Sequence, residues 1–132
     1  MIEKITHKKD VLALIIKNKY KKKKGVNFFT HNKLSQQVAY MNHKKGHVIQ
    51  PHIHKRSLKK IYDTSEVLII LDGSMKIDFY DNKKKYLFSK KIVKNDIIIL
   101  LKFGHGFKIE KNCKFIEVKQ GPFNPKKDKF KF

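Results

Sequence analysis

Three histidines and one glutamate have the residue types and the spacing of a metal-binding site. One residue separates His52 from His54, and on a β-strand that spacing puts both imidazoles on the same face. Glu66 begins an apolar, β-branched segment, and His105 lies between two glycines after another apolar segment. Three imidazoles and one carboxylate suit a divalent transition metal such as Fe, Mn, Ni, Co or Zn. Positions left open for water or substrate would make such a site catalytic in type.

Short segments bounded by turn signals predict an all-β scaffold for these side chains. Asp72-Gly73 predicts a hairpin turn, because this pair tolerates positive φ, and Lys55–Ser65 is predicted to be a loop. About nine or ten strands at close spacing favour a sandwich or barrel over a parallel sheet. For the segment Val11–Lys17, a short helix is the alternative. The predicted strands are Val11–Lys17, Gln36–Asn42, Val48–His54, Glu66–Leu71, Met75–Tyr80, Tyr86–Val93, Ile97–Leu101, Phe107–Glu110 and Lys114–Lys119.

Two intervals around the candidate ligands match a family pattern. Five residues separate Gly46 from His52, and six separate Glu66 from Gly73. These intervals resemble the first motif of the cupin superfamily, in which a glycine precedes His-x-His and another follows the glutamate. The gap of eleven residues between His54 and Glu66 is longer than in that motif, so Lys55–Ser65 would be an insertion.

The second cupin motif is usually Gly-Asp, a strand, a proline-containing turn and a histidine. Here Asn95-Asp96 replaces Gly-Asp, Ile97–Leu101 is the strand, and His105 follows a turn without proline. The chain is most similar to a group of small bacterial single-domain cupins whose biochemistry is unassigned. The similarity covers 67–80, Gly104-His105-Gly106-Phe107 and 116–122.

The resemblance implies one cupin domain over residues 1–132, a double-stranded β-helix or jelly-roll barrel. Its core would span about 36–119, with an N-terminal strand extension and a basic C-terminal tail at 120–132. His52, His54, Glu66 and His105 would bind one divalent metal ion.

Several functions are compatible with such a site. The leading one is a small-molecule enzyme, isomerase-like or epimerase-like, acting on an anionic or sugar-type metabolite, as in surface polysaccharide biosynthesis. An iron-dependent dioxygenase and a non-catalytic module binding sugars or polyanions are the alternatives. No residue stands out as the general base; Tyr62, Tyr80 and metal-bound water are the candidates. The candidate substrate-binding residues are Gln50, which is in phase with His52, Arg56, which could clamp a phosphate or carboxylate, and Tyr40.

The formal net charge of +21 raises the question of a polyanionic partner. Arg56 is the only arginine, whereas readers of bases favour its bidentate contacts. We therefore attribute the charge mainly to lysine bias, expect an anionic small molecule, and do not expect nucleic acid as the specific partner. Cys113 is the only cysteine, which suits a reducing cytoplasm. We expect no signal peptide and no membrane span. A homodimer is compatible with the sequence.

Overall fold

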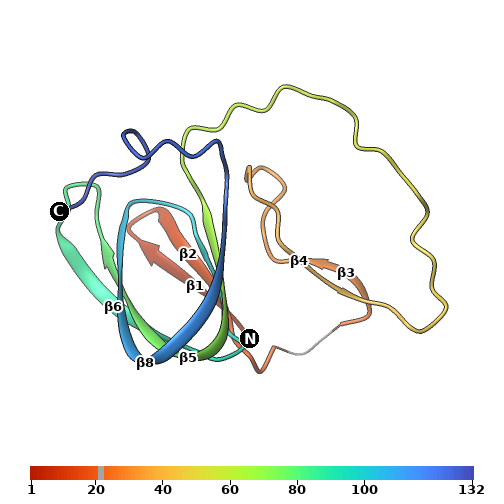
Figure 1. Cartoon of the computed structure of the whole chain (residues 1–132), viewed down its shortest axis with the longest axis horizontal. Helices are drawn as coiled ribbons and strands as arrows, with labels where there is room; N and C mark the ends of the chain where they lie inside the picture. Colours follow the sequence, from red (N-terminus) through yellow and green to blue (C-terminus); the bar gives the residue numbers. More distant parts are fainter. Residues whose placement is uncertain (21–22) are drawn as a thin grey trace. The chain divides into compact units, whose positions relative to one another are not determined.

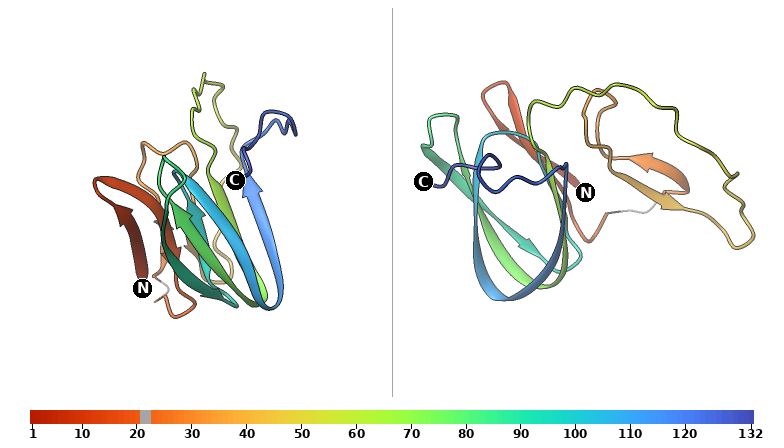
Figure 2. Two further views of the ribbon diagram at one scale, coloured as in Figure 1. Left: turned by 90° about the vertical axis from the view of Figure 1, so that its left-hand side faces the viewer. Right: turned by 45° about the horizontal axis from the view of Figure 1, so that its top comes forward.

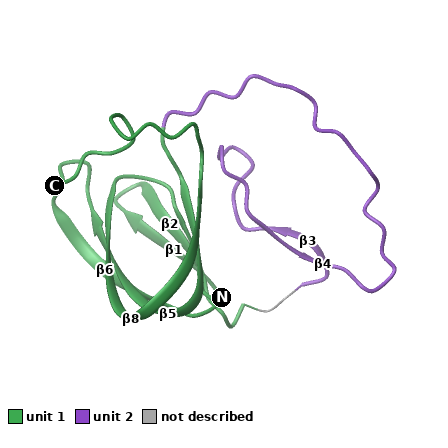
Figure 3. Cartoon of the chain, viewed as in Figure 1, with its two compact units in different colours: residues 1–20, 63–132 green, residues 21–62 purple. Residues whose placement is uncertain are grey.

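The computed structural model describes residues 1–20 and 23–132, and the described chain is built from β-strands without a helix (Figure 1). It divides into two compact units. Unit 1 comprises residues 1–20 and 63–132, and unit 2 comprises residues 21–62 (Figure 3). Unit 1 therefore includes the N-terminal strands that the predicted core of 36–119 leaves out.

Eight strands form in the described residues, and all their pairings are antiparallel. Unit 2 holds a single two-stranded ribbon, β3 (Gly25–Phe28) with β4 (Ala39–Asn42). The strands of unit 1 are β1 (Ile2–His7), β2 (Asp10–Ile16), β5 (Glu66–Tyr80), β6 (Tyr86–Val93), β7 (Ile97–Leu100) and β8 (Gly104–Lys119). The all-β prediction is confirmed, and β2, β6 and β7 match their predicted segments to within one residue at each end.

Two predicted breaks in strands are wrong. Asp72-Gly73 does not turn a hairpin, because β5 continues through it from Glu66 to Tyr80. Likewise, Phe107–Glu110 and Lys114–Lys119 belong to the single strand β8. Gly73 does have positive φ, at 75°, but here the positive φ accompanies a shift of the β5–β8 register and does not reverse the chain.

The predicted strand at Val48–His54 is also absent. Residues 43–65 contain no strand, and Ile53 is 94% exposed. Pro51 lies in the middle of the segment and has no backbone N–H to donate to a neighbouring strand. An alternating pattern without a partner strand or a buried face does not suffice to form a strand.

β5 and β8 form the long ribbon around which unit 1 is built. β8 pairs with β5 along one edge, from Glu66↔Lys119 to Tyr80↔Gly104. On the other edge of β5, β7 pairs with residues 66–69 and β6 with residues 74–80. The sheet continues through β2 and β1 beyond β7. The ribbon bends back on itself, so the antiparallel sheet is curled into a half-barrel (Figures 1 and 2).

The bend lies where the β5–β8 register shifts, between Ile70 and Met75. The two backbones approach so closely that a Cβ on Gly73 would lie 1.9 Å from the carbonyl oxygen of Asn112. The β6–β7 turn holds the other edge of β5 at this point. Lys94 N–H donates to Gly73 O at 3.1 Å, and Asn95 N–H donates to Ile70 O at 2.8 Å.

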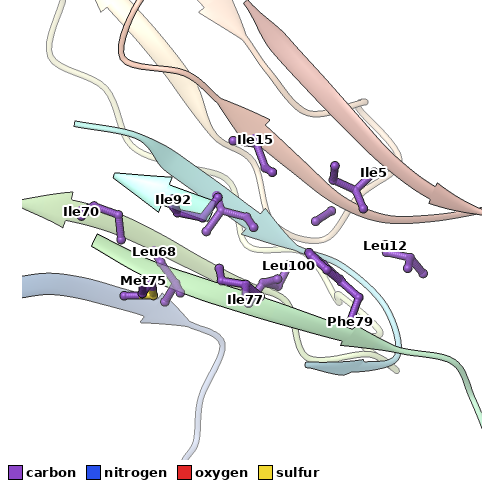
Figure 4. Close-up of a cluster of buried hydrophobic side chains, with 12 residues drawn as sticks. Ile5, Leu12, Ile15, Leu68, Ile70, Met75, Ile77, Phe79, Ile92 and Leu100 are labelled. Atoms are coloured by element: carbon purple, nitrogen blue, oxygen red, sulfur yellow. The ribbon is translucent and has the colours of Figure 1, made fainter. Parts of the chain in front are cut away.

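The curl encloses one hydrophobic core. Leu68 and Ile70 from the first half of β5 gather there with Met75, Ile77 and Phe79 from the second half (Figure 4). All five side chains are at most 1% exposed. β1, β2, β6 and β7 contribute Ile5, Leu12, Ala13, Ile15, Ile92, Ile98 and Leu100. Burial of these aliphatic groups is the main force that keeps the ribbon folded.

We predict that Gly73→Ala destabilises unit 1 by about 3 kcal/mol, because the new Cβ adds positive-φ strain to a backbone clash. Gly106→Ala is the matched control in the same strand pair, where the nearest atom to a new Cβ is 3.9 Å away. It should change the free energy of unfolding by less than about 1 kcal/mol. Urea unfolding followed by circular dichroism measures both. Equal effects of the two substitutions would contradict this account of the bend.

Candidate metal centre

Glu66 in β5 and His105 in β8 lie near opposite ends of the ribbon, and the curl of the ribbon brings them together. Glu66 is paired with Lys119, and His105 with Phe79, so the two would be far apart on a flat sheet. In the folded ribbon, Nε2 of His105 lies 3.0 Å from Oε2 of Glu66. The Nε2–H form of the imidazole therefore donates a hydrogen bond to the carboxylate.

Glu66 lies on the inner face of β5, since Leu68 and Ile70 on the same face belong to the core. Its side chain is 11% exposed, and that of His105 is 26% exposed. The imidazole also stacks on Phe107, with ring centroids 5.3 Å apart and an angle of 27° between the planes. The carboxylate and the imidazole thus face each other at the border between the core and solvent.

The pKa of Glu66 is held below its ordinary value of 4.5. The hydrogen bond from His105 is the main cause, and the charges of His105, Lys119 and Lys129 act in the same direction, whereas burial opposes them. These interactions favour the charged form of the carboxyl group. At neutral pH Glu66 is therefore an ionised carboxylate, which is the form that binds cations.

A small pocket of about 160 Å³ opens beside His105. Lys102 lines it and donates to Asp10 Oδ1 at 2.8 Å. The pocket has room for water or a small polar group rather than for a whole sugar nucleotide. Its lining residues are Asp63, Thr64, Leu100, Leu101, Lys102, Phe103 and His105.

His52 and His54 lie in unit 2, close to each other but on no strand. Their ring centroids are 5.1 Å apart in an edge-to-face arrangement. Nδ1 of His52 lies 2.9 Å from the carbonyl oxygen of Gln50. When Nδ1–H donates this hydrogen bond, the lone pair of Nε2 is left free to bind a metal. Gln50, predicted to bind substrate, thus orients His52 through its backbone.

The described residues supply the predicted ligand types in two pairs. Glu66 with His105 fits two positions of a metal site in donor chemistry, and His52 with His54 fits two more. Over residues 1–20 and 23–132, no group of three or more His, Cys, Asp or Glu side chains is arranged to hold a metal ion. The four-ligand site therefore stays a prediction.

The other candidate residues belong to different elements of the two units. Tyr80 is adjacent to Phe79, whose side chain shares a face with His105, so Tyr80 projects from the opposite face of the ribbon. Tyr62 is 89% exposed, and Arg56 is exposed on the strand-free segment of unit 2. Tyr40 lies in β4 and is half-buried.

Two charged residues near Glu66 were not predicted. Lys119 is the β8 partner of Glu66, and its Nζ donates to Asp128 Oδ2 at 3.0 Å. Only the register of the β5–β8 pair places Lys119 here, and only the path of the tail brings Asp128 to it. A lysine-rich sequence gives no signal that singles out one such pair.

Comparison with known proteins found no matching family model, no matching curated protein and no matching solved structure. In the described part of the chain, a membrane-spanning helix of sufficient length and apolarity is absent.

We predict that Glu66 makes the stability of the metal-free protein depend on acid pH. Its pKa is lowered in the folded chain, so its contribution is complete above the unfolded value of about 4.5 and is lost as the pH falls through the lower folded value. Replacement by Gln should cost about 1 kcal/mol near neutral pH and clearly less at about pH 3. Urea unfolding of both proteins with a chelator present measures the difference. A cost that is the same at both pH values would contradict this role of Glu66.

Proposed function

We propose that this protein is a divalent-metal-binding cupin, an enzyme that acts on an anionic or sugar-type small molecule. The proposal rests on the contact between Glu66 and His105 at the mouth of unit 1, which is the open end of the curled antiparallel sheet where β5 begins and β8 ends. A carboxylate and an imidazole converge there from residues far apart in the sequence. Imidazole and carboxylate are the donors of many catalytic transition-metal sites.

Glu66 and His105 would act as two of the ligands. Because Glu66 is already ionised at neutral pH, it would lose no proton on binding a metal. In the Nε2–H form this nitrogen has no free lone pair, so the imidazole of His105 would have to adopt its Nδ1–H tautomer for Nε2 to bind the ion. Phe107 stacks on the imidazole and limits its rotation.

His52 and His54 would complete the donor set. The support for this is the interval that joins them to Gly46, together with the hydrogen-bonding position between His52 and Gln50. A bound ion would supply Lewis-acid catalysis by polarising a carbonyl or stabilising a deprotonated hydroxyl of the substrate.

The charge of the protein supports an anionic substrate. The chain carries a formal charge of +21, and such a field raises the local concentration of anions. Lys102, whose ammonium group is paired with Asp10, lines the pocket beside His105. An isomerase or epimerase that shifts a proton next to a carbonyl needs the electrophile that this site would provide. The general base is unassigned among the described residues.

We predict that the purified protein binds about one equivalent of a divalent transition metal, and that His105→Ala and His52→Ala each lower its affinity at least about tenfold. Titration with Zn²⁺, Mn²⁺ or Ni²⁺ in a calorimeter, together with elemental analysis, measures stoichiometry and affinity. His31→Ala is the control, because His31 lies outside the predicted ligand set. Metal binding that is unchanged in both ligand variants would overturn the proposed function. Loss in His105→Ala alone would restrict the site to unit 1.

A further inference from the structure

The C-terminal tail, residues 120–132, is fixed at its beginning to the strand pair that carries Glu66. Lys119 ends β8 directly opposite Glu66. Its Nζ donates to Asp128 Oδ2 at 3.0 Å and lies 5.1 Å from the centroid of the Phe123 ring. The side chains of Lys119 and Asp128 are only 18% and 13% exposed. The tail thus folds back onto the end of the ribbon from which it emerges.

The last residue of the tail is fixed at the other end of the ribbon. The ring of Phe132 packs edge-to-face on Tyr80 with centroids 5.1 Å apart, and Lys84 Nζ lies 5.5 Å from its centroid. Gly104 makes room for this ring, since a Cβ there would lie 2.9 Å from Cζ of Phe132. Tyr80 and Gly104 form the pair next to Phe79 and His105.

The two attachments therefore lie at the two ends of the ribbon, one of which carries Glu66 and the other His105. One is on Lys119, the pairing partner of Glu66, and the other is on Tyr80, which is paired with Gly104 and projects from the face opposite to His105. The tail runs between them at the end of unit 1 where β8 ends and β5 begins (Figures 1 and 2). Lys129 of the tail is also close enough for its charge to lower the pKa of Glu66.

We propose that residues 120–132 are a strap over the mouth of unit 1 that controls access to Glu66 and His105. The strap is held by two attachments, the Lys119–Asp128 ion pair and the packing of Phe132 on Tyr80. Neither attachment belongs to the hydrophobic core, so the strap opens without unfolding of the core. Its role as a gate for metal or substrate rests on the proposed function, whereas its covering of His105 does not.

Chemical modification of His105 in the metal-free protein tests the strap directly. Diethyl pyrocarbonate reacts with accessible imidazoles, and peptide mass spectrometry gives the rate at each histidine. The double variant Asp128→Asn with Phe132→Ala should raise the rate at His105 about fivefold, since both attachments are lost. The rate at the exposed His31 should stay the same.

Matched controls separate the strap from general effects of substitution. Phe130→Ala removes a ring of the same tail that is 91% exposed, and Asp72→Asn breaks the exposed ion pair with Lys94 at the bend. Neither should change the rate at His105. Circular dichroism and urea unfolding confirm that each variant keeps its fold.

Hydrogen exchange provides the second readout. Residues 120–132 should exchange faster in the double variant than in the wild type, while β5 and β8 remain protected. Unchanged reactivity of His105 in the double variant overturns the strap, whatever the metal content. If the wild-type protein binds no metal but the reactivity of His105 rises as expected, the strap stands and the proposed function fails.

Discussion

The close approach of β5 and β8 at Gly73 and Asn112 is the constraint on which the rest of unit 1 depends. Without it the two strands would run straight, and Glu66 and His105 would lie far apart along the ribbon. Only a residue without a side chain allows this approach. Gly73 also adopts the positive φ that the irregularity in the strand pair needs at this point. The bend turns both halves of β5 toward one core and makes the carboxylate–imidazole contact possible.

The buried carboxylate of Asp96 stabilises the β6–β7 turn, which contacts the bend. Asp96 is completely buried and accepts hydrogen bonds from the backbone N–H groups of Asn18 and Val93, at 2.8 Å and 3.2 Å, and from Lys17 Nζ at 3.1 Å. It therefore connects the end of β2 to the turn that contacts the bend. A buried charge is tolerated only when it is paired and hydrogen-bonded. Asn95 adopts positive φ in this turn, at 66°, which asparagine accepts more readily than most residues.

The sequence predicted the parts of the fold that depend on local pattern. The segments of β2, β6 and β7 are apolar or alternating and are bounded by turn residues, and all three were placed correctly. Glu66, Leu68 and Ile70 share one face of β5, because the two-residue period of a strand fixes this, whereas only the curl of the sheet makes it the inner face. Asp72-Gly73 was misread because positive φ serves a bulge as well as it serves a hairpin turn.

The remaining features depend on partners distant in the sequence. Val48–His54 has the composition of a strand, yet it has no neighbour and is interrupted by Pro51. The contact between His105 and Glu66 requires the bend, and the position of Lys119 requires the β5–β8 register. Neither can be read from the segments themselves. The residue types of the candidate site were therefore predictable, but their convergence was predictable only in part.

The long-range pairing of β2 also affects how the protein emerges from the ribosome. β1 and β2 are synthesised first, but the partner of Ile16 is Ile97 in β7, which is made after most of the chain. Until β7 appears, the β1–β2 hairpin has an unpaired edge and an apolar face with nothing to cover it, a state prone to association with other chains. The hairpin and the residue after it carry lysines at positions 4, 8, 9 and 17, and lysine is the residue that exposed sheet edges commonly use against such association.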